Sequence, residues 1–537
     1  MCGILFHYSE GSSNNFDDYS EDTLFKSLIP IIRERGRDYE RSTHVDDITL
    51  YSSVLSLRQP LVKQPLIDER FVIQFNGELY NDEISENMND VEFLHHLLIK
   101  NEGNVHKTIG SLKGEFAFTI YDTLESIFYF GKDAFGRKSL CFSDDEMGDV
   151  YISSCFPTNK SKRTKFKECE KGIVYYYDIV SRVLGWDSFN ESDDLPNFLN
   201  VLNDYNREIT YNQDEIITEL HEKLSKAVKR RISTIFPLEK DKTDSKFAVL
   251  FSGGIDCTLI CGLSGELCEQ NTTIDLLNVS FSNPRANLSY DETPDRMLAI
   301  KNCNELNQVY NKKGVYFNLI KVNVPYDEYL KAKQRVIDLI YPNDTEMDLS
   351  IAIAFYFATS GKNSEGKDSN CKVLLSGLGA DEIFGGYTRH ERIFTGISNQ
   401  IRRKLQGKPV KDETIYDINE LQKELRDELQ VDIDRLWERN LMRDDKVISC
   451  WNKEARYPFL DEELNEWCTS MGKIPLTMKL NFNEETGEIT RKLALRELAK
   501  YMKLDFVSQE AKRAIQFGSK SAKMDVGSGK VKGTDKL

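Results

Sequence analysis

Residues 247–257 read FAVLFSGGIDC, and this stretch decides the fold of the larger, C-terminal part of the chain. The apolar run FAVL predicts a buried strand, the glycines predict a loop, and the residues after them have a helix-like pattern. In such a unit the backbone N–H groups at the start of the helix converge on an anion, and the hydroxyl of Ser252 adds a donor. The loop lacks the GxxxxGK[ST] pattern, so it is not a Walker A loop. We therefore predict a phosphate-binding loop of another kind, with Asp256 placed to hold a magnesium ion.

Strands and helices alternate on the C-terminal side of this loop. The segments IDLLNVSF (274–281), VYFNLIKVNV (315–324) and CKVLLSGLG (371–379) predict strands, with helical segments between them. This alternation is typical of an α/β domain, in which a parallel sheet has helices on both faces. The last strand leads into a second glycine loop, LLSGLGADEIFGGY (374–387), in which an Asp-Glu pair follows the glycines.

The first 190 residues have a different pattern. Segments such as FVIQFNGELYN (71–81), GEFAFTIYD (114–122) and KGIVYYYDIV (171–180) are short and rich in Val, Ile, Phe and Tyr, which predicts strands. Helical patches lie between strands, near residues 21–33 and 91–100. The mixture predicts an α+β domain in which sheets pack against helices.

The two patterns are separated by a polar stretch. Residues 191–213 are acidic and rich in Asn, with few apolar clusters, so we predict a linker between a domain of residues 1–190 and a domain of residues 214–537. The tail after Lys520 is rich in Gly, Ser and Lys, and we expect it to be frayed.

Composition excludes several classes of protein. The 537 residues carry a formal net charge of −16, which argues against a general nucleic-acid-binding surface. The apolar runs are far shorter than a membrane span, and the start, MCGILFHYSEGSS, lacks the features of a secretory signal. The eleven cysteines form no paired CxxC motifs, so we expect no zinc site. We therefore expect reduced thiols and a cytoplasmic protein that binds neither nucleic acid nor membranes.

Cys2 directly follows the initiator methionine, which is normally removed before a small residue. Removal would leave Cys2 with a free α-amine, whose unperturbed pKa is about 8. This amine can act as the general base for the adjacent thiol, without a separate histidine. A cysteine at this position also occurs by chance, so the interpretation depends on the segments that follow.

Seven segments of the N-terminal part follow one another in a recognisable order. They are MCGI (1–4), RGRD (35–38), SLRQP (56–60), NGELYN (76–81), NDVE (89–92), GEFAF (114–118) and KDAFG (132–136). In this order they resemble the class II glutamine amidotransferase domain of the asparagine synthetase family. The resemblance implies an Ntn-hydrolase-type αββα sandwich in which Cys2 is the nucleophile that hydrolyses glutamine.

The resemblance also implies the other groups of a glutamine site. Arg58 is suited to hold the α-carboxylate through a forked pair of hydrogen bonds, and Asp90 to pair with the α-ammonium, with Glu78 in the same glutamine-binding set. The Asn76 side chain and the Gly77 backbone N–H would be the donors to the oxyanion. Taken alone, the Asn-Gly pair also fits an ordinary turn.

Four segments of the C-terminal part resemble the ATP-pyrophosphatase domain of the same family, namely FSGGIDC (251–257), SGLGADEIFGGY (376–387), KEARYPFLD (453–461) and KRAIQFGS (512–519). The resemblance implies that ATP and Mg²⁺ activate a carboxylate as an acyl-adenylate. Asp256 and Asp381 would bind the metal with Glu382 beside them, and Lys512 or Arg513 would neutralise charge at the α-phosphate. The ATP-binding residues that it implies are Leu250, Ser252, Gly253, Gly254, Asp256, Val279, Ser376 and Gly377.

The chain also departs from the family at one important position. In asparagine synthetases the second glycine loop reads SGEGSDE, and its Glu is thought to serve amide formation, whereas Leu378 stands there in this chain. Leucine can neither accept a proton nor orient ammonia. Cys257 also replaces a serine in the first loop. With GLGADE (377–382), RDDKVI (443–448) and KRAIQFGS, the chain resembles a divergent subgroup, the asparagine synthetase domain-containing proteins.

Three hypotheses about function stay open on the sequence. The first is synthesis of asparagine from aspartate, with glutamine as the nitrogen donor and ATP as the activating nucleotide. The second keeps both half-sites but amidates a different acid, because Leu378 makes the acceptor pocket more apolar. The third is a degenerate amidotransferase that acts as an interaction or regulatory protein. Retention of Cys2, Arg58, Asn76 and Asp256 counts against the third, and the sequence makes no prediction of oligomeric state.

Overall fold

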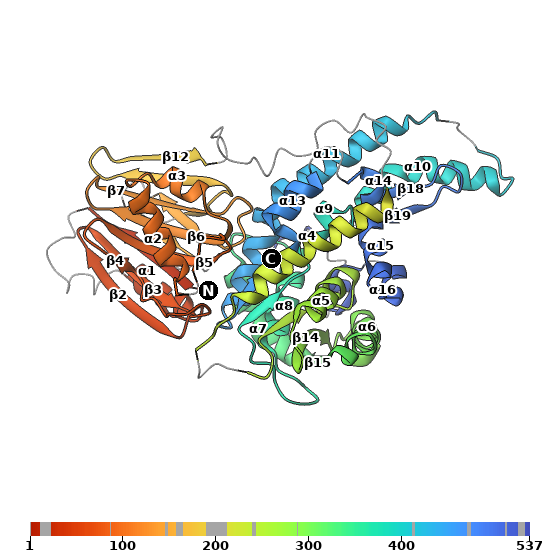
Figure 1. Ribbon diagram of the computed structural model, residues 1–537, viewed down its shortest axis with the longest axis horizontal. Coiled ribbons are helices and arrows are strands. Elements are labelled where there is room, and N and C mark those ends of the chain that lie inside the picture. Colours follow the sequence, from red (N-terminus) through yellow and green to blue (C-terminus); the bar gives the residue numbers. More distant parts are fainter. Residues whose placement is uncertain are drawn as a thin grey trace.

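Figure 1 shows the computed structural model of the chain, with the N-terminal sheets on one side and the helix-rich C-terminal part on the other. The structure describes residues 2–10, 23–85, 87–144, 149–156, 165–189, 212–238, 243–286, 288–410, 414–469, 474–510, 513–524 and 532–537. Residues 191–211 of the predicted linker lie outside the described residues, and so does Lys512.

The N-terminal part contains two antiparallel sheets of six strands each. The first has the order β10, β8, β9, β1, β3, β2, with bounds Phe166–Glu168, Cys141–Asp144, Val150–Ser153, Cys2–Tyr8, Ile48–Val54 and Tyr39–Val45. The second has the order β12, β11, β7, β6, β5, β4, with bounds Val183–Ser188, Ile173–Asp178, Ile127–Lys132, Gly114–Asp122, Phe71–Leu79 and Leu66–Ile67. Three helices accompany them: α1 (Thr23–Arg33), α2 (Asp90–Lys100) and α3 (Val105–Gly110).

The two sheets pack face to face, with helices on the outer faces. Ile4 and Phe6 of β1 share a buried core with Phe128 and Phe130 of β7. Leu5 points to the opposite face of the strand, where it packs in the core that includes α1, because neighbouring side chains of a strand alternate. Helices α2 and α3 cover the outer face of the second sheet. The predicted αββα sandwich is confirmed.

The C-terminal part is built on a five-stranded parallel sheet. Its order is β15, β14, β13, β16, β17, with bounds Val315–Val324, Thr272–Phe281, Phe247–Leu250, Val373–Leu375 and Glu454–Arg456. The helices that follow or flank these strands are α4 (Gln213–Ser233), α5 (Ile255–Leu267), α6 (Pro294–Tyr310), α7 (Tyr326–Ile340), α8 (Glu346–Ser360), α9 (Ala380–Ile383) and α12 (Met442–Ser449). The predicted parallel α/β fold is confirmed.

The strand order of this sheet changes direction between β13 and β16. From β13 the chain adds β14 and β15 on one side and then returns to place β16 on the other. In open parallel sheets, ligands bind in the crevice at the carboxyl ends of the strands where the order reverses. Both glycine loops follow these two strands, so the topology brings them together.

The remaining elements extend the C-terminal part beyond the sheet. They are α10 (Thr388–Leu405), α11 (Ile418–Leu436), a π-helical turn (Trp437–Leu441), α13 (Glu462–Thr469), α14 (Leu476–Lys479), β18 (Leu480–Phe482), β19 (Ile489–Arg491), α15 (Leu493–Tyr501), α16 (Asp505–Gln509) and α17 (Ile515–Gly518). Among the described residues, no helix is both long and apolar enough to cross a membrane.

The prediction of a frayed tail after Lys520 is wrong for the described residues. Met524 is fully buried, and residues 533–537 lie along the start of α8. Met347 and Glu346 donate backbone hydrogen bonds of 2.9 Å to the carbonyls of Gly533 and Asp535. The first N–H groups of a helix have no partner within the helix, so this segment satisfies them despite its polar composition.

Candidate active sites

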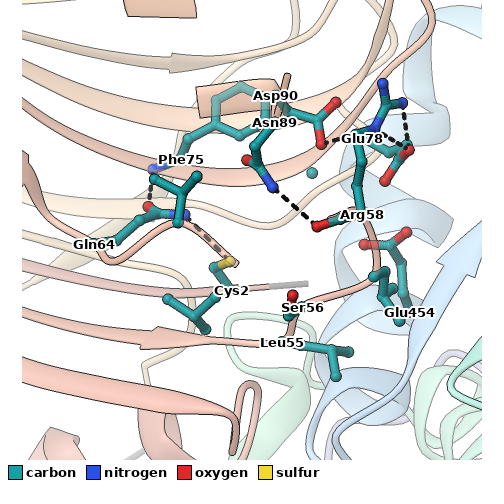
Figure 2. A pocket seen from close by; sticks show the side chains of 14 residues that line it. Cys2, Leu55, Ser56, Arg58, Gln64, Phe75, Glu78, Asn89, Asp90 and Glu454 are labelled. Carbon is teal, nitrogen blue, oxygen red and sulfur yellow. Dashed lines mark hydrogen bonds and ion pairs between the residues drawn. The ribbon is translucent and has the colours of Figure 1, made fainter. Parts of the chain in front are cut away.

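The first site is a narrow pocket at the start of β1, where Cys2 begins the strand (Figure 2). Its lining combines residues of the loop after β3, of β5 and of the start of α2 with one residue from the C-terminal part. These residues include Cys2, Leu55, Ser56, Arg58, Gln64, Phe75, Gly77, Glu78, Asn89, Asp90 and, from β17, Glu454. The structure therefore brings together the residues that the sequence predicted for the glutamine site.

Asn76 of β5 lies beside Cys2, and its side chain is fully buried. Its Oδ1 accepts a hydrogen bond of 2.8 Å from the backbone N–H of Cys2. Its Nδ2 has no hydrogen-bond partner among the described residues. A buried donor without a partner is costly, and it is suited to bind an oxygen that a ligand brings.

Gly77 follows Asn76 with a φ of 152°, a value that L side chains rarely adopt. A Cβ atom at this position would lie 2.0 Å from the carbonyl oxygen of Glu115 on β6. The backbone at the pocket therefore requires glycine.

Gln64 is a pocket residue that no sequence motif identified. Its Nε2 donates to the sulfur of Cys2 at 3.4 Å, and its Oε1 accepts a hydrogen bond of 2.7 Å from the N–H of Phe75. The hydrogen bond from Phe75 fixes the orientation of the Gln64 side-chain amide, so that its Nε2 faces the sulfur of Cys2. Burial raises the pKa of the Cys2 thiol, so the thiol is neutral at rest and needs a base to become a nucleophile.

Arg58, Glu78 and Asp90 form a charged cluster on the opposite wall of the pocket (Figure 2). Arg58 Nη2 lies 2.6 Å from Glu78 Oε1, and Arg58 Nε lies 3.5 Å from Asp90 Oδ2. Burial and the neighbouring Glu78 carboxylate raise the pKa of Asp90 to about 7. Glu78 also pairs with Arg456, whereas the contact of Asp90 with Arg58 is longer, so Asp90 is the carboxylate suited to bind the α-ammonium of an amino acid.

We expect the KM for glutamine to rise as the pH falls from about 8 to about 6, by roughly tenfold for each unit below the pKa of Asp90. Protonation removes the negative charge that would pair with the α-ammonium of the substrate. Initial rates of glutamate release over a series of glutamine concentrations measure this effect. Asp90→Asn should bind glutamine weakly at every pH in this range, and a pH-independent KM in the wild type would contradict the assignment.

The second site is a cavity of about 880 Å³ at the carboxyl ends of β13 and β16. Residues of both glycine loops line it, as the strand order requires. Of the residues predicted for ATP, metal or phosphate, the lining includes Leu250, Ser252, Gly254, Asp256, Val279, Ser376, Gly377, Asp381, Glu382 and Arg513. Gly253 lies against α6 instead, with a φ of 79°, and a Cβ there would lie 2.4 Å from the N atom of Ala299.

Asp256 and Asp381 lie in the first turns of α5 and α9, directly after the two glycine loops, and both pair with the ammonium of Lys492. The Nζ of Lys492 lies 2.6 Å from Asp256 Oδ1 and 2.5 Å from Asp381 Oδ1. One or two carboxylates that share a cation beside a phosphate site are typical of magnesium sites. The residues present therefore fit Mg²⁺, with the Lys492 ammonium showing where a positive charge is stabilised. Lys492 was missed in the sequence because nothing around it marks a site.

Leu378 lines the same cavity and packs against the core of the C-terminal part. Three other carboxylates line the cavity and are buried: Asp295 of α6, Glu382, which accepts a hydrogen bond from the Tyr387 hydroxyl, and Asp444 of α12. Burial raises the pKa of Asp444 to about 6, although Arg443 lies only 2.8 Å away. The cavity therefore lacks a carboxylate at position 378 but contains others.

Comparison with known proteins identifies both parts of the chain. The glutamine amidotransferase domain family matches residues 1–182, and the asparagine synthase family matches residues 219–528, more than half of the chain. An asparagine synthetase domain-containing protein of Saccharomyces cerevisiae is 40% identical over 572 residues, which span 100% of this chain and 99% of the relative.

More distant relatives also align over nearly the full length. An asparagine synthetase domain-containing protein of Drosophila melanogaster is 29% identical, over 97% of this chain and 98% of its own. A putative glutamine-hydrolyzing asparagine synthetase of Methanocaldococcus jannaschii is 26% identical, over 93% of this chain and 91% of its own. The two similar domain-containing proteins confirm the predicted subgroup. The chain therefore belongs to the asparagine synthase family, and it joins a glutamine amidotransferase domain to an asparagine synthase domain, as a glutamine-dependent amide-forming ligase does.

Proposed function

We propose that the chain transfers the amide nitrogen of glutamine to a carboxylate that ATP has activated, and that the acceptor is aspartate. The observation that carries the proposal is the convergence of Asp256 and Asp381, each next to a glycine loop, on the ammonium of Lys492, in a chain that also places Cys2 against Asn76. We assign residues 1–190 to the glutaminase domain and residues 214–537 to the synthetase domain. The cytoplasmic location stays a prediction from the sequence.

The glutaminase half-reaction follows from the contacts of Cys2. Once Met1 has been removed, the α-amine of Cys2 takes the proton of the thiol, and the sulfur attacks the side-chain carbonyl carbon of glutamine. Asn76 Nδ2 and the N–H of Gly77 stabilise the oxyanion. The α-amine then returns the proton to the leaving nitrogen, ammonia departs, and water releases glutamate from the thioester. Arg58 holds the α-carboxylate of the substrate and Asp90 holds its α-ammonium, with Glu78 beside them in the same glutamine-binding set.

The synthetase half-reaction uses the groups at the second cavity. The acceptor carboxylate attacks the α-phosphate of ATP and displaces pyrophosphate, and ammonia then displaces AMP from the acyl carbon to form the amide. Asp256 and Asp381 would hold the metal, and the loop N–H groups with Ser252 and Ser376 would bind phosphate oxygens. Arg513 would balance negative charge on the nucleotide, a role that the sequence assigned to it or to Lys512.

A quantitative product balance tests the proposal. Purified protein is incubated with ATP, Mg²⁺, glutamine and aspartate, and AMP, pyrophosphate, glutamate and asparagine are measured together. Formation of AMP and pyrophosphate with glutamate and asparagine is the expected outcome. ADP and phosphate would contradict the proposed cleavage of ATP. Pyrophosphate formed with another acid in place of aspartate would favour the second candidate, a different acceptor, for which Leu378 is the specific observation. No turnover of either glutamine or ATP would favour a degenerate amidotransferase.

A further inference from the structure

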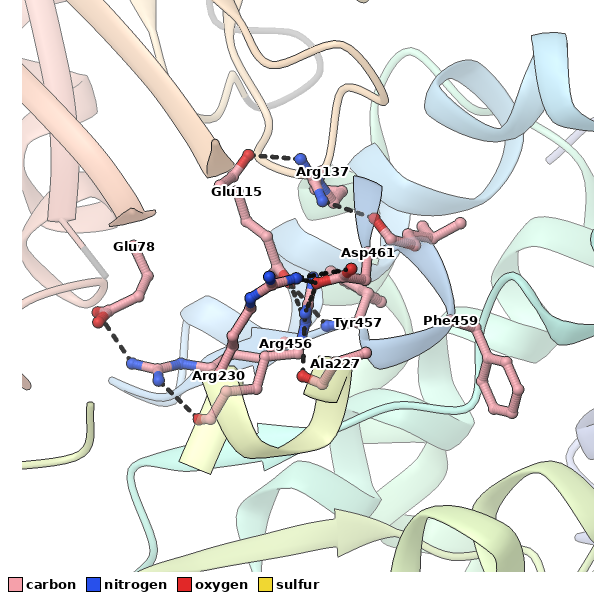
Figure 3. Close-up of polar contacts among 12 residues, drawn as sticks. Glu78, Glu115, Arg137, Ala227, Arg230, Arg456, Tyr457, Phe459 and Asp461 are labelled. Carbon is pink, nitrogen blue, oxygen red and sulfur yellow. Dashed lines mark hydrogen bonds and ion pairs between the residues drawn. The ribbon is translucent and has the colours of Figure 1, made fainter. Parts of the chain in front are cut away.

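The glutamine pocket borders a buried arginine that belongs to the other half of the chain (Figure 3). Arg456 ends β17, the edge strand of the parallel sheet, and its side chain is fully buried. Its Nη2 lies 3.0 Å from Glu78 Oε2, and its Nε donates a hydrogen bond of 2.7 Å to Glu454 Oε1. Its Nη1 donates to the carbonyl of Arg231 and to Thr234 Oγ1, at 2.7 and 2.8 Å. The guanidinium is thus held in one orientation from three sides.

Glu78 is shared between two arginines from the two halves. Its Oε1 accepts hydrogen bonds of 3.1 and 2.6 Å from Nε and Nη2 of Arg58, while its Oε2 faces Arg456. Arg58 is the residue to which we assign the α-carboxylate of glutamine. The position of Glu78 therefore decides how much of the Arg58 guanidinium is left for the substrate.

The effect of losing Arg456 follows from this competition. A buried carboxylate needs charged partners, and Glu78 without Arg456 would have only Arg58. Both of its oxygens would then compete with the substrate carboxylate for the same guanidinium. Glutamine would bind more weakly, whereas the contacts of Cys2 with Asn76 and Gln64 would not change.

The backbone of the same residue contacts the second site. The carbonyl of Arg456 accepts a hydrogen bond of 3.0 Å from the N–H of Ser376, the first residue of the second glycine loop. Glu454, two residues earlier, lines the glutamine pocket itself. One short strand of the synthetase half therefore contacts both sites.

We propose that Arg456, supplied by the synthetase half, is a positioning residue of the glutamine site: it holds Glu78 so that Arg58 can bind the substrate carboxylate. The inference rests on the proposed glutaminase function of the first pocket. It implies that the N-terminal half alone lacks a complete glutamine site.

The test is glutamine affinity and turnover in Arg456→Lys. A lysine keeps the charge but cannot bridge Glu78, Glu454 and the Arg231 carbonyl at once. Isothermal titration of glutamine into the full-length chain carrying Cys2→Ala measures binding without turnover. We expect Arg456→Lys to weaken the Kd, and to raise the KM of the enzyme with intact Cys2, by about 10–100-fold, the effect of one charge-assisted hydrogen bond. The kcat should stay within about twofold, as should the rate of Cys2 alkylation by iodoacetamide.

Arg231→Lys is the matched control. Arg231 is equally buried at the same interface, where it contacts Glu115 and Asp461 at 2.9 and 2.8 Å, and it is not part of the pocket lining. It should lower thermal stability to a similar degree and leave the Kd for glutamine unchanged. Parallel loss of kcat, affinity and stability in both variants would mean that Arg456 is only structural, and the proposal would fail.

Two further results keep the outcome decisive. If Arg456→Lys does not fold, Glu454→Gln loosens the same guanidinium with little change in volume and should weaken the Kd in the same direction. An unchanged Kd in Glu454→Gln would then overturn the proposal. If the Cys2→Ala chain binds no glutamine, the proposed function fails together with the inference. If the wild type binds glutamine normally but does not turn it over, only the proposed function is refuted. The Kd for glutamine can still be compared with and without Arg456→Lys, so the inference is still tested.

Discussion

Replacing Asn76 by alanine is expected to slow glutamate release from glutamine by about 100–1,000-fold, the usual effect of losing one oxyanion donor. The Nδ2 group of Asn76 is buried and has no partner among the described residues, while Oδ1 is held by the N–H of Cys2. The donor is therefore fixed in place before the substrate arrives. Steady-state glutaminase kinetics measure the effect, which should appear mainly in kcat because the donor acts on charge that develops during the reaction.

Two comparison variants separate this role from a general effect on the pocket. Cys2→Ala should abolish glutamate release and leave amide formation from added ammonium salts intact. Ser56→Ala changes another residue of the lining, with no contact to the sulfur among the described side chains, and should leave kcat within about twofold. Full glutamine hydrolysis by Cys2→Ala would refute the assignment of the nucleophile.

At the second site, the wild-type chain is expected to make asparagine slowly, and Leu378→Glu to increase the rate of synthesis. A missing general base typically costs about 100–10,000-fold. Adenylation should survive, because Asp256, Asp381 and the glycine loops all line the cavity. The expected signature in the wild type is uncoupling: pyrophosphate and glutamate form in excess over asparagine. The ratio of asparagine to pyrophosphate measures it directly.

Leu378→Gln is the matched control, because it has the shape of the glutamate variant without a carboxylate, and it should not increase synthesis. Leu378 packs partly against the core, so either variant is expected to lose some stability.

One-for-one coupling of ATP cleavage to asparagine formation in the wild type would show that another carboxylate acts as the general base. Asp444→Asn would then test one alternative on the cavity wall, since the pKa of Asp444 is raised to about 6 and its carboxylate is ionised at neutral pH.

The amino-acid sequence by itself determined both fold types, and its resemblance to a known family pointed to most of the residues proposed for the two sites. Apolar periodicity and the position of glycines are local properties of a segment, and they distinguish short alternating strands from a βαβ pattern. The glycine loops are also recognised from a local pattern, since a strand followed by glycines and the start of a helix is a typical anion-binding unit. The departure at Leu378 is likewise plain in the sequence.

Only the tertiary structure decided how the two halves meet. The segment RDDK (443–446) consists of four charged residues, yet all four side chains are buried: Asp445 pairs with Arg35 across 410 residues of sequence, and Lys446 pairs with Glu168. Gln64, Lys492 and Arg456 were missed for the same reason. The partners that give these residues a role are far away in the chain, and no local pattern of polarity records a charge that is compensated only after folding.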